Sequence, residues 1–408
     1  MTNHSQPRSA VQLTLLMCFA EIMSMTGFAA YPTLLPQLQR EWELSNSAAG
    51  LIGGVVFTGY MVAVPVLSSL TDRIDSRRVY LGACVLSVLG AAGFALFAEG
   101  LLTALVFQFL IGAGLAGTYM PGLKTLTDQL DGPAQSRATA FYTASFGLGS
   151  SVSILVCGKL GATLGWEAAF WFGATGPIIA AVLVNLGMPR GHVHTAPEHE
   201  RPPLLNFKPV LKNPTTRAYI LGYTLHNYEL FGQRSWMVAF LVFTASLQPA
   251  DAPMLASAAT LAAIINLLGP VMSVSGNELA IRFGRSRIIF TFMCASGLTA
   301  CFLGFTAPLP WIVVFLMMCM HYGLMLGDSA ALTAGAVAAA PVGQRGAMMA
   351  VYSLMGFTGA FLAPLVFGAV LDLAGGNQDV TAWGLAFASI GIFGALAPLA
   401  RWLHARRG

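Results

Sequence analysis

Apolar residues gather in long runs along this chain, and short segments rich in charged residues, glycine or proline separate the runs. A helix needs about 20 mostly apolar residues to cross a bilayer. By that measure the pattern predicts twelve membrane-spanning helices. Their approximate ranges are 11–36, 47–70, 79–98, 101–127, 137–162, 167–188, 217–245, 253–275, 288–307, 309–337, 346–372 and 383–403.

The composition agrees with this pattern. Of the 408 residues, 56% are hydrophobic and only 9% are charged, whereas soluble domains carry about 25% charged residues. So few charges cannot cover a globular surface. We therefore expect an all-α integral membrane protein with the lipid bilayer as a partner. The six cysteines lie in apolar runs, which predicts buried thiols and no disulfide.

Lysine and arginine residues predict the orientation of the chain. Nearly all of them fall in the loops that share a side with the N-terminus, and such loops face the cytoplasm. Both termini are then cytoplasmic, and we expect a multi-pass protein of a bacterial inner membrane. Once the basic residues at the span ends are assigned to the two sides, Lys124 and Arg234 remain, and both fall within predicted spans.

The longest polar segment predicts the domain organisation. Residues 189–216 are rich in proline, histidine and charge, which is typical of a linker. We expect a cytoplasmic linker there, between six-helix bundles at 1–188 and 217–408. Metal binding by the linker histidines is the weaker alternative, and these residues are His192, His194 and His199.

The two predicted bundles repeat each other about 208 residues apart. After the second run comes "SSLTDRIDSRR" (68–78), and after the eighth comes "NELAIRFGRSR" (277–287). Arg73 then aligns with Arg282, and Arg137 aligns with Arg345. A repeat of this kind predicts pseudo-symmetric bundles with a substrate site between them, near the midplane.

The first of these loops carries a resemblance to a known family. It is similar to the Gly-x-Leu-Ala-Asp-Arg-x-Gly-Arg-Arg motif between helices 2 and 3 of the major facilitator superfamily. Ser68 and Asp75 replace the two glycines of that motif. The second copy has Ile281 in place of the acid. The residues that match in the first copy are Leu70, Asp72, Arg73 and Arg77.

Two further motifs add to the resemblance, which covers the whole chain. The segment "GWEAAFW" (165–171) resembles the family's Gly-Trp-x-x-Ala-Phe signature at the start of helix 6. The segment "FLIGAGLAG" (109–117) resembles the glycine motif of helix 4, with Gln108 where many members have arginine. The stretch 222–236 also resembles the cyanate and nitroimidazole permeases of the superfamily. The resemblance implies a secondary transporter that works by alternating access.

The charged residues of the loop ends form a predicted gate. A carboxylate and several guanidinium groups at the cytoplasmic mouth can form charge-assisted pairs between neighbouring helix ends. Such pairs would hold one state of the transporter closed. The alternative is that the arginines only set the topology. The predicted gating residues are Asp72, Arg73, Arg77, Arg78, Arg137 and Asp128.

Ionisable residues inside spans are candidates for function, because charge is costly in a membrane. In the run 217–245, His226 and Glu229 are three residues apart and share a helix face. Arginine recognises a carboxylate through two parallel hydrogen bonds, so Arg234 is a candidate ligand for an anionic substrate. The alternative is a Glu229–Arg234 pair that only fixes helix packing.

Other runs add candidates for proton transfer. Glu21 lies near mid-depth of the first run, where desolvation favours a protonated carboxyl group. Its alternative role is a hydrogen bond to a neighbouring helix.

His321 and Asp328 are seven residues apart on one helix face, and His321 can accept a coupling proton. Lys124 lies near Asp128 and Arg137, which suits a structural network as well as a substrate contact. The predicted proton-coupling residues are Glu21, Glu229, His321 and Asp328.

Polar and aromatic residues at the same depth complete the predicted pocket, although packing is the alternative for most of the aromatic ones. The predicted substrate-binding residues are His226, Asn227, Tyr228, Arg234, Trp236, Tyr119 and His321.

These patterns favour transport over catalysis, since the sequence has no recognisable metalloprotease, nucleotide-binding or hydrolase motif. We expect a proton-coupled transporter of a small organic anion, acting as a monomer without cofactor, metal or nucleic-acid partner. Its partners would be the small-molecule substrate and protons. The alternatives are a proton-driven multidrug antiporter and, from another class, a membrane receptor or embedded enzyme. The antiporter motif Gly-Pro-x-x-Gly-Gly is missing late in helix 5, where Ile154 and Cys157 stand.

Overall fold

The structure is a computed structural model that describes residues 9–71, 73–190, 208–251, 253–341 and 345–395. Its regular elements are helices. They are α1 (Ala10–Ser24), α2 (Ala30–Glu41), α3 (Asn46–Leu70), α4 (Ser76–Phe97), α5 (Leu101–Thr127), α6 (Gly132–Leu164), α7 (Trp166–Gly187), α8 (Lys208–Lys212), α9 (Pro214–Ser246), α10 (Ala258–Phe283), α11 (Arg285–Leu303), the 3₁₀ turn η2 (Gly304–Thr306), α12 (Trp311–Leu326), α13 (Ser329–Ala339), α14 (Arg345–Leu373) and α15 (Val380–Ala395).

The chain is a multi-pass membrane protein. By length and composition, nine helical segments in the described part of the chain are suited to cross a membrane. The helices α1 and α15 are apolar but shorter, and the 33-residue α9 carries the polar residues discussed below. The count of twelve spans, the two pseudo-symmetric bundles and the domain boundaries at 188 and 217 stay predictions.

The first predicted span, 11–36, is not one continuous helix in the structure. The helix α1 ends at Ser24 and α2 begins at Ala30. Pro32 lies in the first turn of α2, where its missing N–H costs nothing, but its ring would clash with the carbonyl of Phe28 in a continuous helix. The hydroxyl of Ser153 on α6 satisfies the freed backbone, because it donates to the carbonyl of Thr26 at 2.7 Å and accepts from the amide of Ala29 at 3.1 Å.

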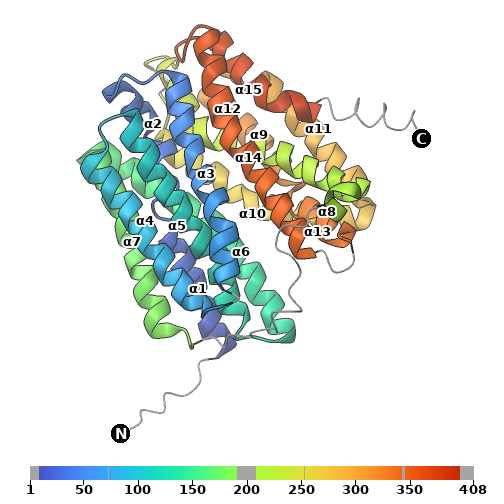
Figure 1. Cartoon of the computed structure of the whole chain (residues 1–408). Coiled ribbons are helices and arrows are strands. Elements are labelled where there is room, and N and C mark those ends of the chain that lie inside the picture. The colour runs from blue at the N-terminus through green and yellow to red at the C-terminus, as the bar shows by residue number, and fades with distance from the viewer. Residues whose placement is uncertain (1–8, 72, 191–207, 252, 342–344, 396–408) are drawn as a thin grey trace.

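The helices lie in two groups, with α1–α7 on one side and α9–α15 on the other (Figure 1). The seam between the groups is formed by α3 against α14, α6 against α10, and α2 against α9. Glycine makes the closest approach possible. A Cβ atom on Gly50 would overlap the backbone of Pro364, and one on Gly54 would overlap the backbone of Phe361. Small residues are the usual means of bringing membrane helices together.

A carboxylate joins the two groups at one end of the seam. Oδ1 of Asp372, near the end of α14, accepts from the amide N–H and the side chain of Asn46 at 3.0 and 2.8 Å. Its Oδ2 accepts from the amide N–H and the hydroxyl of Ser47 at 2.8 and 2.6 Å. The carboxylate therefore caps the N-terminus of α3, where the helix dipole favours negative charge. We call this the Asp372 end, and the opposite end, which holds Arg77 at the start of α4, the Arg77 end.

Candidate functional site

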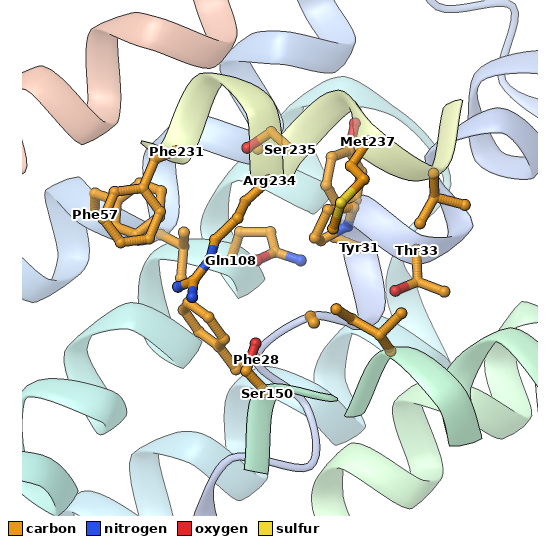
Figure 2. A pocket seen from close by; sticks show the side chains of 16 residues that line it. Phe28, Tyr31, Thr33, Phe57, Gln108, Ser150, Phe231, Arg234, Ser235 and Met237 are labelled. Atoms are coloured by element: carbon orange, nitrogen blue, oxygen red, sulfur yellow. The ribbon is translucent and has the colours of Figure 1, made fainter. Parts of the chain in front are cut away.

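A cavity lies at the seam between the two groups of helices (Figure 2). Its wall is built from the break between α1 and α2 and from α3, α5, α6 and α9, so both groups contribute. Most of the lining is apolar or aromatic, with few polar groups, which is the usual composition of a small-molecule site. The aromatic lining residues are Phe28, Tyr31, Phe57 and Phe231.

Arg234 on α9 supplies the positive charge of this cavity. Its Nε and Nη2 donate to the hydroxyl of Tyr322 at 2.9 and 2.6 Å, and the guanidinium lies 5.7 Å from the ring centroid of Phe231. Within the described part of the chain Arg234 makes no ion pair with an acidic residue. The alternative Glu229–Arg234 pair is therefore not formed in this structure. A guanidinium with donors to spare can bind a carboxylate from outside the protein.

Hydrogen bonds hold Arg234 in place across the seam. The hydroxyl of Tyr322 on α12 donates to Oδ1 of Asn266 on α10 at 2.7 Å. Nδ2 of Asn266 donates in turn to the hydroxyl of Ser151 on α6 at 2.8 Å and to the carbonyl of Gly147 at 3.1 Å. Because this chain of bonds runs from one group of helices into the other, the position of the guanidinium depends on how the groups pack.

Two buried histidine–carboxylate pairs lie within α9–α15. Nε2 of His321 lies 2.9 Å from Oε1 of Glu229, whose other oxygen accepts from the hydroxyl of Ser296 at 3.1 Å. Nδ1 of His226 lies 2.7 Å from Oδ1 of Asp328, which stands between α12 and α13. The second approach lacks the alignment of a hydrogen bond, and it is an ion pair only when His226 is protonated. The structure thus brings together four of the predicted residues as two pairs.

Glu21 is buried differently, in the group α1–α7. Its side chain is fully buried, and Oε2 accepts from the hydroxyl of Tyr142 on α6 at 2.8 Å and of Ser24 at 3.3 Å. The other oxygen, Oε1, has no hydrogen-bond partner, and no ion pair involving Glu21 is found in the described residues. A carboxyl group surrounded by hydroxyl groups can hold a proton without stranding a buried cation.

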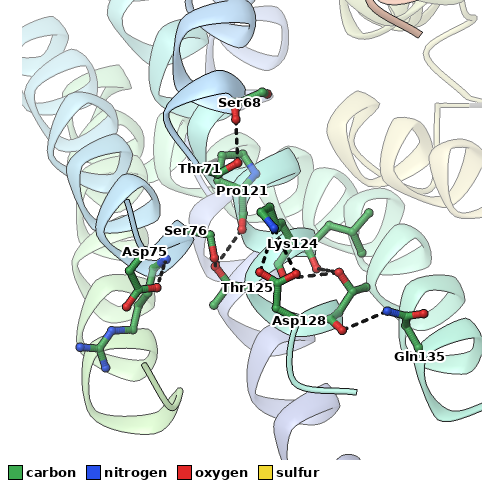
Figure 3. Close-up of polar contacts among 12 residues, drawn as sticks. Ser68, Thr71, Asp75, Ser76, Pro121, Lys124, Thr125, Asp128 and Gln135 are labelled. Carbon is green, nitrogen blue, oxygen red and sulfur yellow. Dashed lines mark hydrogen bonds and ion pairs between the residues drawn. The ribbon is translucent and has the colours of Figure 1, made fainter. Parts of the chain in front are cut away.

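The predicted gating residues gather at the Arg77 end, but Asp72 lies outside the described residues. Nη1 of Arg77 donates to the carbonyls of Met188 at 2.9 Å and of Asn185 at 3.3 Å, so it caps α7. Lys124 and Asp128 form an exposed pair at 3.0 Å within α5 (Figure 3). Three more of the predicted gating residues have exposed side chains, and they are Arg73, Arg78 and Arg137. The predicted linker histidines also lie outside the described residues.

Of the predicted substrate-binding residues, only Arg234 is among those that line the cavity described above. Trp236 is fully buried, donates to the carbonyl of Pro364 at 3.0 Å and stacks on Phe367. Nδ2 of Asn227 donates to a backbone carbonyl of its own helix. Tyr119 and Tyr228 make aromatic contacts. The ring of Tyr119 stacks on Tyr142, and the ring of Tyr228 packs edge-on against Phe393.

Sequence reasoning missed several residues of the cavity. The most polar of them is Gln108 on α5, whose Nε2 is buried without a partner. A glutamine within the apolar run 101–127 was the available signal. The others that line the wall and carry a hydroxyl group are Tyr31, Thr33, Ser150 and Ser235.

Comparisons with known proteins agree with this architecture. The profile of the Major Facilitator Superfamily matches residues 17–277. The chain is 26% identical to a niacin transporter of Acinetobacter baylyi over 39% of its own length and 36% of that protein. It is 23% identical to human protein spinster homolog 1 over 59% and 47%. It is 24% identical to a benzoate transport protein of Acinetobacter baylyi over 34% and 31%. The aligned part is thus less than half of each relative.

The fold has a counterpart among solved structures. A bacterial homologue of the human lysosomal transporter Spinster, in an inward-facing and occupied conformation, superposes with a TM-score of 0.79 over 98% of both chains. At 15% sequence identity, this likeness shows the fold alone.

Proposed function

Because the chain belongs to the Major Facilitator Superfamily, we propose that it is a secondary transporter of a small organic anion whose carboxylate is held by Arg234. The observation that carries the proposal is the guanidinium at the cavity between the helix groups, free of any acidic partner in the described residues. Arginine binds a carboxylate in a planar, two-pronged way. The chain is a transporter rather than an enzyme, as its family membership implies.

Two of the relatives support this substrate class. Niacin and benzoate are both small aromatic carboxylic acids, and the two bacterial relatives are named for them. None of the three relatives reported above is named for drug export. Each alignment covers less than half of the relative. The proposed substrate class therefore rests on the residues of the cavity, and the names of the two bacterial relatives support it.

We further propose that protons drive the transport by alternating access. Glu21 is a candidate carrier, because it can bind and release a proton without breaking an ion pair. The Glu229–His321 pair is the second candidate, since both of its members can bind a proton and they lie in direct contact. The two sites are distinguished by the substitutions described in the Discussion.

The test of the proposal is binding of benzoate and nicotinate to the purified, full-length protein and to Arg234→Lys. Lysine keeps the charge but loses the two-pronged geometry. A hydrogen bond to a charged group is worth about 1.5–3 kcal/mol, so affinity should fall roughly ten- to a hundredfold. The matched control is Arg217→Lys, on an exposed residue at the start of the same helix, which should bind as the wild type does. Equal affinity for Arg234→Lys and wild type would remove Arg234 from the site.

We propose that the Arg77 end faces the cytoplasm. In a variant without the native cysteines, a cysteine at the exposed Arg78 should react with impermeant maleimide only from the cytoplasmic side. A cysteine at the exposed Gln378, beyond α14, should react only from outside. The opposite labelling pattern would reverse the orientation and every statement of direction built on it.

A further inference from the structure

Two buried polar side chains at the cavity have unused hydrogen-bonding capacity. Gln108 is 3% exposed and its Nε2 has no partner, and Thr33 is 5% exposed with no partner for its Oγ1. Both residues line the cavity with Arg234. In Figure 2 the Gln108 side chain lies between the guanidinium of Arg234 and Thr33. Buried polar groups are nearly always paired, so an unpaired one that faces a binding cavity indicates a ligand group that pairs with it.

The surroundings of these side chains restrict what that ligand can be. The rest of the wall is apolar, and it includes the aromatic rings of Phe28, Tyr31 and Phe57. Flat rings pack well against other rings in offset or edge-to-face arrangements. The permanent charge is at Arg234, whereas Gln108 and Thr33 offer only neutral hydrogen bonds. The chemistry of this lining therefore suits a ring with an anionic group in one position and a neutral polar group in another. The cavity volume in this state is about 30 Å³, so the helix groups must move apart to admit such a ligand.

We propose that Gln108 is a specificity-determining residue that donates a hydrogen bond from Nε2 to an acceptor on the ring of an aromatic carboxylate held by Arg234. This inference rests on the proposed function and narrows its substrate class to aromatic carboxylates with a hydrogen-bond acceptor on the ring, away from the carboxylate. A ligand without that acceptor leaves Nε2 buried and unpaired, which is how polar sites reject analogues that lack the matching group.

Benzoate and the pyridine carboxylates form a matched set of probes for this idea. They have nearly the same shape, and the pyridine nitrogen replaces one ring C–H by an acceptor. Nicotinate and isonicotinate place the nitrogen away from the carboxylate, and picolinate places it beside the carboxylate. Wild-type protein should bind nicotinate or isonicotinate about three- to tenfold more tightly than benzoate, as one neutral hydrogen bond predicts. Picolinate should gain nothing over benzoate.

The deciding variant is Gln108→Leu, which removes the amide at nearly constant size. It should bind benzoate at least as well as wild type and lose the preference for the pyridine carboxylate. Gln108→Met is the second variant, because it keeps the length of the side chain. The matched control is Gln233→Leu, since Gln233 is fully buried with both amide atoms unpaired but is not among the residues that line the cavity. Its ligand preference should equal that of wild type.

The outcomes separate this inference from the proposed function. If wild type binds benzoate through Arg234 but Gln108→Leu and Gln108→Met keep the full preference for the pyridine ring, the role of Gln108 is wrong and the anion site stands. If wild type binds benzoate and pyridine carboxylates equally, the specificity proposal is also overturned. If wild type binds none of these ligands, both proposals fail for aromatic carboxylates.

Discussion

The buried carboxyl groups of α1–α7 and those of α9–α15 contact different kinds of side chain. In the first group Glu21 contacts hydroxyl groups, those of Tyr142 and Ser24. In the second group Glu229 and Asp328 each lie against a histidine. A carboxyl group among hydroxyl groups can change its protonation state alone, whereas a carboxylate in a buried pair cannot lose its partner without leaving a charge in a low dielectric. We infer that the first arrangement suits proton transfer and the second suits a fixed or coupled element.

The largest effect is expected when one paired residue in α9–α15 loses its partner. His321→Leu removes the partner of Glu229, and breaking a buried charged pair costs about 3–5 kcal/mol. Thermal and denaturant unfolding in detergent would measure the loss. The double variant His321→Leu/Glu229→Leu should recover most of it, because no charge is left behind. A single variant as stable as wild type would mean that the pair carries little charge.

A smaller effect is expected from Glu229→Gln, which keeps the shape of the side chain and removes its charge. The contacts with His321 and Ser296 become hydrogen bonds between neutral groups, so each contact falls from about 1.5–3 kcal/mol to about 0.5–1.5 kcal/mol. Unfolding under the same conditions gives the comparison. If stability is unchanged while substrate uptake stops responding to a pH gradient, Glu229 is the proton carrier and the contrast between the helix groups is weaker than proposed.

The smallest loss of stability is expected from Glu21→Gln, the same substitution in the other group. The amide oxygen can still accept from Tyr142, so the change should stay below about 1.5 kcal/mol. Transport should respond strongly, however. Uptake into liposomes would lose its dependence on the pH gradient, while substrate binding remains. A pH-dependent uptake equal to that of wild type would exclude Glu21 as the proton carrier.

The all-helical class and most helix positions could be predicted from the sequence, because a helix that crosses a membrane needs a long run of apolar residues. The sequence predicted the interruption of the first span poorly. The relevant signals were Gly27 and Pro32, but an apolar run hides a break whose backbone groups are satisfied by a distant residue, here Ser153. Hydropathy reads one segment at a time and does not register such contacts.

The candidate site shows the same limit. Helical spacing placed His226 and Glu229 on one face of a helix, and a Glu229–Arg234 pair was the alternative to a substrate contact by Arg234. The structure pairs Glu229 with His321, 92 residues away on α12. Pairing between helices depends on their rotation and depth, which a single sequence does not reveal. Gln108 was visible as a departure from a family motif, but only the cavity gives its side chain a proposed use.

The carboxylate of Asp372 has a consequence for how the Asp372 end can part. Asp372 and its two hydrogen bonds with Ser47 lie where water has access, since the Asp372 side chain is exposed and Ser47 is half-buried, while the other donor, Asn46, is buried. If α3 moves away from α14, water can take the place of each donor, and the N-terminus of α3 can be hydrated as well. Hydrogen bonds exchanged in this way contribute modestly on balance. The contact can therefore break and form again at little cost in free energy. The packing at the glycine residues of the same seam differs, because water cannot replace the contact of one helix backbone with another.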